Sequence, residues 1–107
     1  MTGPEILDRV YAVIRERKRE RPPGSYVVQL LDGGVGAIGA KVREESAELL
    51  DAVGRPDAAH IAHEAADLLF HVWVLLGAVD VAPAQVYEVL ERRFGIGGLT
   101  EKAARGR

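Results

Sequence analysis

One segment of the chain, from about residue 57 to residue 77, is apolar enough to require burial over most of its surface. Between residues 61 and 79 the only ionisable side chains are His63, Glu64, Asp67 and His71. At 100° per residue of an α-helix, these four side chains fall within an arc of about 100°, and the remaining circumference is apolar. The segment is therefore expected to be a long helix at the centre of a core or of a subunit interface.

The segments on either side are also patterned for helices. Apolar residues between residues 6 and 14 recur at helical spacing, with Thr2-x-x-Glu5 as a capping-box pattern before them. A helix is expected from about residue 35 to residue 53, and a last helix should turn Val86, Val89, Leu90 and Phe94 inward. The sequence thus predicts an all-α fold of four to five helices.

Turn residues divide the chain between these helices. The Pro22-Pro23-Gly24 turn ends the first helix, so residues 1–24 comprise that helix and its turn. Ser25 is placed to cap the segment from Tyr26 to Leu31, which fits a helix or a strand equally well. Residues 95–107 follow the last helix and are expected to form a mobile tail. With 107 residues, the chain is long enough for a single domain spanning residues 1–107.

Composition limits the partners that the chain can bind. Fourteen basic and sixteen acidic residues give a net charge of −2, which does not fit a nucleic-acid-binding surface. There is no cysteine, so disulfides and zinc-thiolate sites are excluded. No apolar signal core begins the chain, and the longest uninterrupted apolar stretch, Val72 to Val79, is too short to cross a bilayer. We expect a soluble cytoplasmic protein that binds neither nucleic acid nor membrane.

Two acidic clusters, Glu44-Glu45-x-x-Glu48 and Glu64-x-x-Asp67, form the candidate functional site. Their spacing puts the carboxylates of each cluster on one helix face, so two packed helices would bring four or five carboxylates together. Such a group repels itself unless a cation neutralises it, and carboxylate oxygens suit Mg²⁺ or Mn²⁺. The alternative is a solvated helix face with weak ion pairs, which fits poorly on the apolar helix that carries Glu64.

Other polar residues near these clusters have more than one interpretation. Lys41 could pair with the glutamates that follow it or hold a phosphate. His71 lies one turn beyond Asp67 and could support a metal ligand, contact a phosphate or be a hydrogen-bonded core residue. We expect His60 and His63 on the surface.

A glycine pattern, Gly34-x-Gly36-x-x-Gly39, matches the dinucleotide-binding fingerprint. That fingerprint requires a following parallel strand, whereas residues 41–53 are patterned as a helix without a break. We therefore interpret these glycines as a turn that opens a helix.

The paired acidic motifs on helices resemble the shared metal site of the all-α nucleotide pyrophosphohydrolases. This superfamily includes MazG proteins, dimeric dUTPases and phosphoribosyl-ATP pyrophosphatase. Finer matches resemble the last of these families and cover about residues 5–105. They are Pro23-Gly24-Ser25-Tyr26 with Leu30-Leu31, Lys41-Val42-x-Glu44-Glu45-x-x-Glu48, Glu64-Ala65-Ala66-Asp67-Leu68-Leu69-Phe70-His71 and Gly98-Leu99-x-Glu101-Lys102-Ala103. Phe70 replaces the usual Tyr, Val27 replaces Thr, and Gly36 and Gly39 replace bulkier or polar residues.

The resemblance implies Mg²⁺-dependent hydrolysis of phosphoribosyl-ATP to phosphoribosyl-AMP and pyrophosphate, the second step of histidine biosynthesis. A water molecule bound by the metal, or oriented by one of the carboxylates, would attack the α-phosphorus. The implied metal ligands are Glu45, Glu48, Glu64 and Asp67. Glu44 is implied to orient or deprotonate the water. The implied substrate contacts are Lys41 and His71, Lys102 and Arg105 from the tail, and Tyr26 against a base or ribose, with core packing as the alternative for Tyr26.

The central apolar helix presents more apolar surface than three short helices can cover, which predicts a homodimer that completes the bundle. Two other functions fit the same motifs. One is a house-cleaning (d)NTP pyrophosphatase with the same metal site and a different base pocket. The other is a non-catalytic helical dimerisation module in which the acidic pairs are structural.

Overall fold

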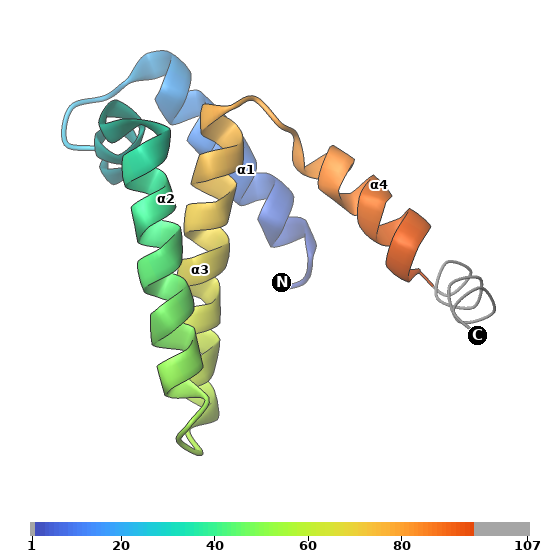
Figure 1. The fold of residues 1–107 in the computed structure, drawn as a ribbon. Helices are drawn as coiled ribbons and strands as arrows, with labels where there is room; N and C mark the ends of the chain where they lie inside the picture. The colour runs from blue at the N-terminus through green and yellow to red at the C-terminus, as the bar shows by residue number, and fades with distance from the viewer. Residues whose placement is uncertain (1, 96–107) are drawn as a thin grey trace.

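The computed structural model describes residues 2–95, which form four α-helices and no strand (Figure 1). The all-α prediction is confirmed. The helices are α1 Glu5–Glu20, α2 Tyr26–Ala52, α3 Ala58–Ala78 and α4 Pro83–Phe94. Residues 96–107, including Lys102 and Arg105, lie outside the described part, and so does nearly all of the expected C-terminal tail.

The start of α1 differs from the sequence prediction. The N-cap residue is Pro4, whose side chain makes no capping hydrogen bond, and Glu5 is the first residue of the helix. A capping box needs its glutamate at the third helical position, so Thr2 and Glu5 are placed too early to form one. At the other end, Arg21 adopts a left-handed conformation with φ of 52° and donates its backbone N–H to Arg17 O at 2.8 Å.

The segment that fitted either helix or strand forms the first part of α2. The Ser25 hydroxyl oxygen accepts a hydrogen bond from the Val28 backbone N–H at 3.3 Å and caps this helix, as expected. Gly34 interrupts α2 with φ of 83° and ψ of 173°, a conformation that is essentially restricted to glycine. The glycine turn is thus confined to Gly34, because Gly36 and Gly39 lie within the helix.

The core lies where α1 and α2 pack against α3. Ile14, Ile38 and Val74 are fully buried there, and each contributes about 1.5–3 kcal/mol by burial. α1 approaches α3 closely at Gly77, where an added Cβ would lie 2.8 Å from the Ile14 Cγ2 atom. The Trp73 indole also donates to Leu7 O at 3.0 Å. These contacts hold α1 across α3 and leave the facing sides of α2 and α3 to form the site.

The apolar segment forms α3, one residue later than expected at each end. The Asp57 side chain caps the helix by accepting a hydrogen bond from the His60 backbone N–H at 3.1 Å. By length and composition alone, α3 meets the criteria for a membrane span, although the core helix of a soluble protein also meets them. The short uninterrupted run from Val72 to Val79 is therefore not sufficient to exclude a span.

α4 projects away from the other three helices and contacts mainly α1 (Figure 1). The Tyr87 hydroxyl donates to the Asp8 carboxylate at 2.9 Å across this contact. Val89 and Leu90 were expected to face inward, yet they are 39% and 49% exposed in the single chain. That expectation is wrong for an isolated protomer because the body of the bundle does not cover this face of α4.

Candidate metal centre

The structure brings carboxylates from the two acidic clusters together between α2 and α3. Oxygen atoms of Glu45, Glu48 and Glu64 lie within 4.8 Å of one another. Glu45 is 6% exposed and Glu64 is 8% exposed, whereas Glu48 is exposed to solvent. Because α2 and α3 run side by side in opposite directions, residues far apart in the sequence meet at one level of the bundle (Figure 1).

The two buried carboxylates each have one oxygen without a hydrogen-bond partner among the described residues. These atoms are Oε2 of Glu45 and Oε2 of Glu64. Burial raises the pKa of the Glu45 carboxyl above its ordinary value, and the neighbouring Glu48 raises it further. Buried oxygens that lack a partner are costly, and a cation bound between the two helices would satisfy both. The donor set therefore fits a hard divalent cation.

The remaining members of the two clusters lie at the edge of this group. The Glu44 carboxylate is exposed and accepts a hydrogen bond from Lys41 Nζ at 3.4 Å, and the same ammonium lies 3.6 Å from Glu45 Oε1. Asp67 is half-buried, with its Oδ2 atom 3.3 Å from His63 Nε2. Together with Glu64, these two residues form a second group whose ligand atoms lie within 4.8 Å of one another.

His71 is buried and uses both ring nitrogens within the chain. Its Nδ1 atom lies 2.7 Å from the backbone carbonyl oxygen of Asp67, and its Nε2 atom lies 2.9 Å from the Tyr26 hydroxyl. A carbonyl only accepts, so Nδ1 donates, and in the neutral imidazole Nε2 accepts from the tyrosine. A phosphate contact by His71 would therefore require Tyr26 to move. Tyr26 is 46% exposed, and its ring stacks on Phe70 with ring centroids 6.2 Å apart.

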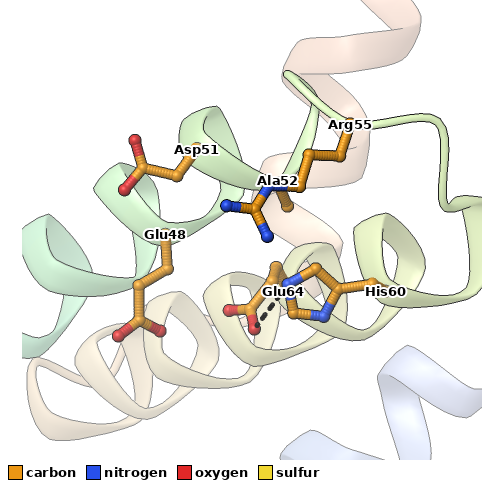
Figure 2. A pocket seen from close by; sticks show the side chains of 6 residues that line it. All are labelled: Glu48, Asp51, Ala52, Arg55, His60 and Glu64. Atoms are coloured by element: carbon orange, nitrogen blue, oxygen red, sulfur yellow. Dashed lines mark ion pairs between the residues drawn. The ribbon is translucent and has the colours of Figure 1, made fainter.

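A pocket opens beside the carboxylates at the end of the bundle where α2 turns into α3 (Figure 2). It has a volume of about 420 Å³, and its lining residues are Glu48, Asp51, Ala52, Arg55, His60 and Glu64. His60 Nε2 lies 3.9 Å from Glu64 Oε1. The pocket thus combines carboxylates with an imidazole and a guanidinium.

Sequence reasoning did not assign Asp51, Arg55, His60 or His63 to the site. The prediction that His60 and His63 lie on the surface is confirmed, since both are exposed. Each of them also lies four residues before an acidic residue of the same helix and approaches its carboxylate. That spacing was a usable signal. Asp51 similarly follows Glu48 by three residues. Arg55 follows Asp51 by four residues, but it lies beyond the end of α2, so its position depends on the turn between the two helices rather than on helical spacing.

The family model described as phosphoribosyl-ATP pyrophosphohydrolase matches residues 7–94. A protein of Geobacter sulfurreducens named phosphoribosyl-ATP pyrophosphatase is 48% identical over 101 residues, covering 94% of each chain. Proteins of the same name are 45% identical in Rhodopirellula baltica, covering 92% of this chain and 85% of the relative, and 42% identical in Azospirillum brasilense, covering 94% and 90%.

Proposed function

Because the chain belongs to the phosphoribosyl-ATP pyrophosphohydrolase family, we propose that it hydrolyses phosphoribosyl-ATP to phosphoribosyl-AMP and pyrophosphate, in histidine biosynthesis. The observation that carries this proposal is the convergence of Glu45, Glu48 and Glu64, with two buried oxygens that have no partner among the described residues. An enzyme that binds a polyphosphate needs positive charge at its site, and this cluster can hold that charge as a metal ion.

We assign Mg²⁺ as the metal, with Mn²⁺ as a substitute, because both prefer carboxylate oxygens. Glu45, Glu48, Glu64 and Asp67 would hold it. When bound, the ion would neutralise charge on the phosphate oxygens of the nucleotide. Glu45 and Glu64 would hold the ion most firmly because they are buried on two packed helices, whereas Glu48 and Asp67 are more accessible.

The exposed Glu44 carboxylate is the candidate for orienting the attacking water or accepting its proton. Lys41 holds this carboxylate through the 3.4 Å contact, and the same ammonium is available to a phosphate oxygen. The water oxygen forms a bond to the α-phosphorus as the bond from that phosphorus to the bridging oxygen breaks. The pair of electrons leaves with pyrophosphate, and Glu44 takes the proton of the water.

The Tyr26 ring offers an exposed aromatic face for the base or a ribose, and its hydroxyl holds the buried His71 in place. The tail residues Lys102 and Arg105 remain proposed phosphate contacts that lie outside the described residues. We also assign the protein to the cytoplasm, since a highly charged nucleotide does not cross a lipid bilayer unaided.

A homodimer would cover apolar surface that the single chain leaves exposed. Ile6 is 47% exposed and Leu69 is 45% exposed, and both border an apolar pocket of about 190 Å³ between α1 and α3. Leu90 on α4 is also 49% exposed. Burying such side chains against a second copy is favourable by about 25 cal/mol per Å². Sedimentation equilibrium should give twice the chain mass, and a stable monomer at micromolar concentration would refute the dimer.

The substrate is tested by measuring pyrophosphate release from phosphoribosyl-ATP and from each common dNTP at equal concentration with Mg²⁺. We expect phosphoribosyl-ATP to be turned over with the highest kcat/KM. A higher kcat/KM for a dNTP would instead indicate a house-cleaning pyrophosphatase. Asp67→Asn tests the non-catalytic alternative, because a structural acidic pair predicts no change in any activity with this variant.

A further inference from the structure

We propose that Arg55 binds a phosphate group of the nucleotide substrate beside the carboxylate cluster, an inference that rests on the proposed function of the same site. Arg55 belongs to the turn between α2 and α3, outside both acidic motifs. Its guanidinium lines the 420 Å³ pocket together with Glu48 and Glu64, which also belong to the group of converging carboxylates.

The backbone around Arg55 is fixed by hydrogen bonds on both sides. The Arg55 N–H donates to Ala52 O at 3.1 Å, and the Arg55 carbonyl oxygen accepts from the Asp57 N–H at 2.9 Å. Asp57 in turn caps α3 through the His60 backbone N–H. Pro56 follows Arg55 directly and restricts the chain further. The turn therefore holds the base of the arginine side chain at a defined place relative to α3.

The guanidinium turns back over Ala52 and points into the pocket toward Glu64 and His60 (Figure 2). Ala52 is 4% exposed, and its small side chain leaves room for the arginine above it. Within residues 2–95 the Arg55 side chain forms no hydrogen bond or ion pair, although it shares the pocket with three carboxylates. Its five N–H donors thus remain available in the pocket.

An arginine whose role was to neutralise the carboxylates would be expected to pair with one of them. Instead, Glu64 is 8% exposed and aims into the pocket with its Oε2 atom unpartnered in the described structure. Carboxylates on one side and a guanidinium on the other match a phosphate that is shared between a cation and an arginine. The pocket volume is within the range of small-ligand sites, about 300–1,000 Å³. The geometry therefore favours an oxyanion as the partner of Arg55.

The phosphate can belong to either half of the substrate that hydrolysis separates. Inorganic pyrophosphate represents the leaving half, and AMP represents the half that keeps the α-phosphate. Binding of each anion with Mg²⁺ present should be measured by titration calorimetry for the wild-type protein, Arg55→Ala and Arg55→Lys. Arg19→Ala is the matched control, because Arg19 is exposed in the last turn of α1, at the other end of the bundle from the α2–α3 turn.

We expect Arg55→Ala to weaken binding of at least one anion by about 10- to 100-fold, the usual loss for a charged hydrogen bond. Arg55→Lys should recover part of the affinity because it keeps the charge but not the planar donor pair. Weaker pyrophosphate binding assigns the contact to the leaving half, and weaker AMP binding assigns it to the other half. Affinities for both anions within twofold of the Arg19→Ala values would overturn the inference.

Binding of Mn²⁺ alone, followed by electron paramagnetic resonance, separates phosphate binding from an effect on the metal centre. Loss of a positive charge beside carboxylates should leave Mn²⁺ affinity unchanged or increase it. A weaker Mn²⁺ affinity in Arg55→Ala would show that the arginine acts through the carboxylates, which contradicts the inference. These titrations need no turnover, so they remain decisive if phosphoribosyl-ATP is not the substrate. Conversely, wild-type KM in Arg55→Ala would refute the arginine contact and leave the proposed function intact.

Discussion

Replacing Glu45 by glutamine should stabilise the metal-free protein at neutral pH, although it removes a proposed metal ligand. Glu48 and Glu64 each place an oxygen within 4.8 Å of Glu45, and each such pair of charges repels by about 3.5 kcal/mol at an effective dielectric constant of about 20. Lys41 Nζ lies 3.6 Å from Glu45 Oε1, and this attraction offsets about 4.5 kcal/mol of the repulsion at the same dielectric constant. A net repulsion of about 2 kcal/mol remains, and solvent screening of the exposed Glu48 lowers the measurable gain to about 1–2 kcal/mol.

The effect should depend on pH with a defined sign. Burial raises the pKa of Glu45 above 4.5, so the folded protein binds this proton more tightly than the unfolded chain does. The metal-free wild type therefore loses stability as the pH rises from below 4.5 through the raised pKa, whereas Glu45→Gln has no such group to titrate. The two proteins should melt at similar temperatures at pH 4. At pH 8 the variant should melt about 4–10 °C higher.

Thermal unfolding by circular dichroism with EDTA or Mg²⁺ provides the assay. A cation at a hundred times its dissociation constant should stabilise the wild type by about 2.7 kcal/mol, and Glu45→Gln should lose most of this gain. Glu88→Gln serves as the control because Glu88 is exposed on α4, so it should change stability by about 0.5 kcal/mol or less. A lower melting temperature for metal-free Glu45→Gln at pH 8 would refute the reasoning, as would a wild type that does not respond to Mg²⁺.

Four further substitutions test the fold and the site. Gly34→Ala should lower the free energy of unfolding in urea by about 1–3 kcal/mol, because a φ of 83° strains a residue that has a Cβ. Gly36→Ala should stabilise the protein, because Gly36 lies within the helix and an added Cβ there meets open space. Equal effects of the two substitutions would contradict the break in α2. Gly77→Ala should cost about 1–3 kcal/mol because its Cβ meets Ile14 at 2.8 Å, and an unchanged unfolding midpoint would argue against this close approach. Tyr26→Phe keeps the ring but removes the hydroxyl bonded to the buried imidazole, so KM should rise by about threefold to tenfold; an unchanged KM would exclude this positioning role.

The helices were predictable because burial imposes a period on the sequence. The apolar segment expected from residue 57 to residue 77 forms α3 from Ala58 to Ala78, with Asp57 as its cap. The first part of α2 was harder to predict, because the segment from Tyr26 to Leu31 is so short that its pattern fits a helical turn or a strand. The outcome depends on packing of Val27 and Leu30 into the core, which a local pattern does not contain.

For the candidate site, the sequence could group only those carboxylates that lie on one face of the same helix. Spacing alone put Glu45 with Glu48 and Glu64 with Asp67, but it could not determine how α2 and α3 align. That alignment places Glu64 with Glu45 and Glu48, whereas the approach of His63 to Asp67 follows from their spacing of four residues on α3. Arg55 enters the pocket through the geometry of the α2–α3 turn, which no periodicity describes. The exposed apolar face of α4 likewise follows from where the helix projects rather than from its composition.

The most direct test of the account is pyrophosphate release from phosphoribosyl-ATP by the wild type and by Glu64→Gln, each with Mg²⁺ and with EDTA. Glu64 belongs to both groups of converging side chains, and glutamine preserves its shape. The account predicts turnover by the wild type only with Mg²⁺, and a loss of about 100-fold or more in kcat/KM for the variant. Hydrolysis that survives EDTA or the loss of this carboxylate would contradict the claim that the cluster between α2 and α3 is a metal-dependent active site.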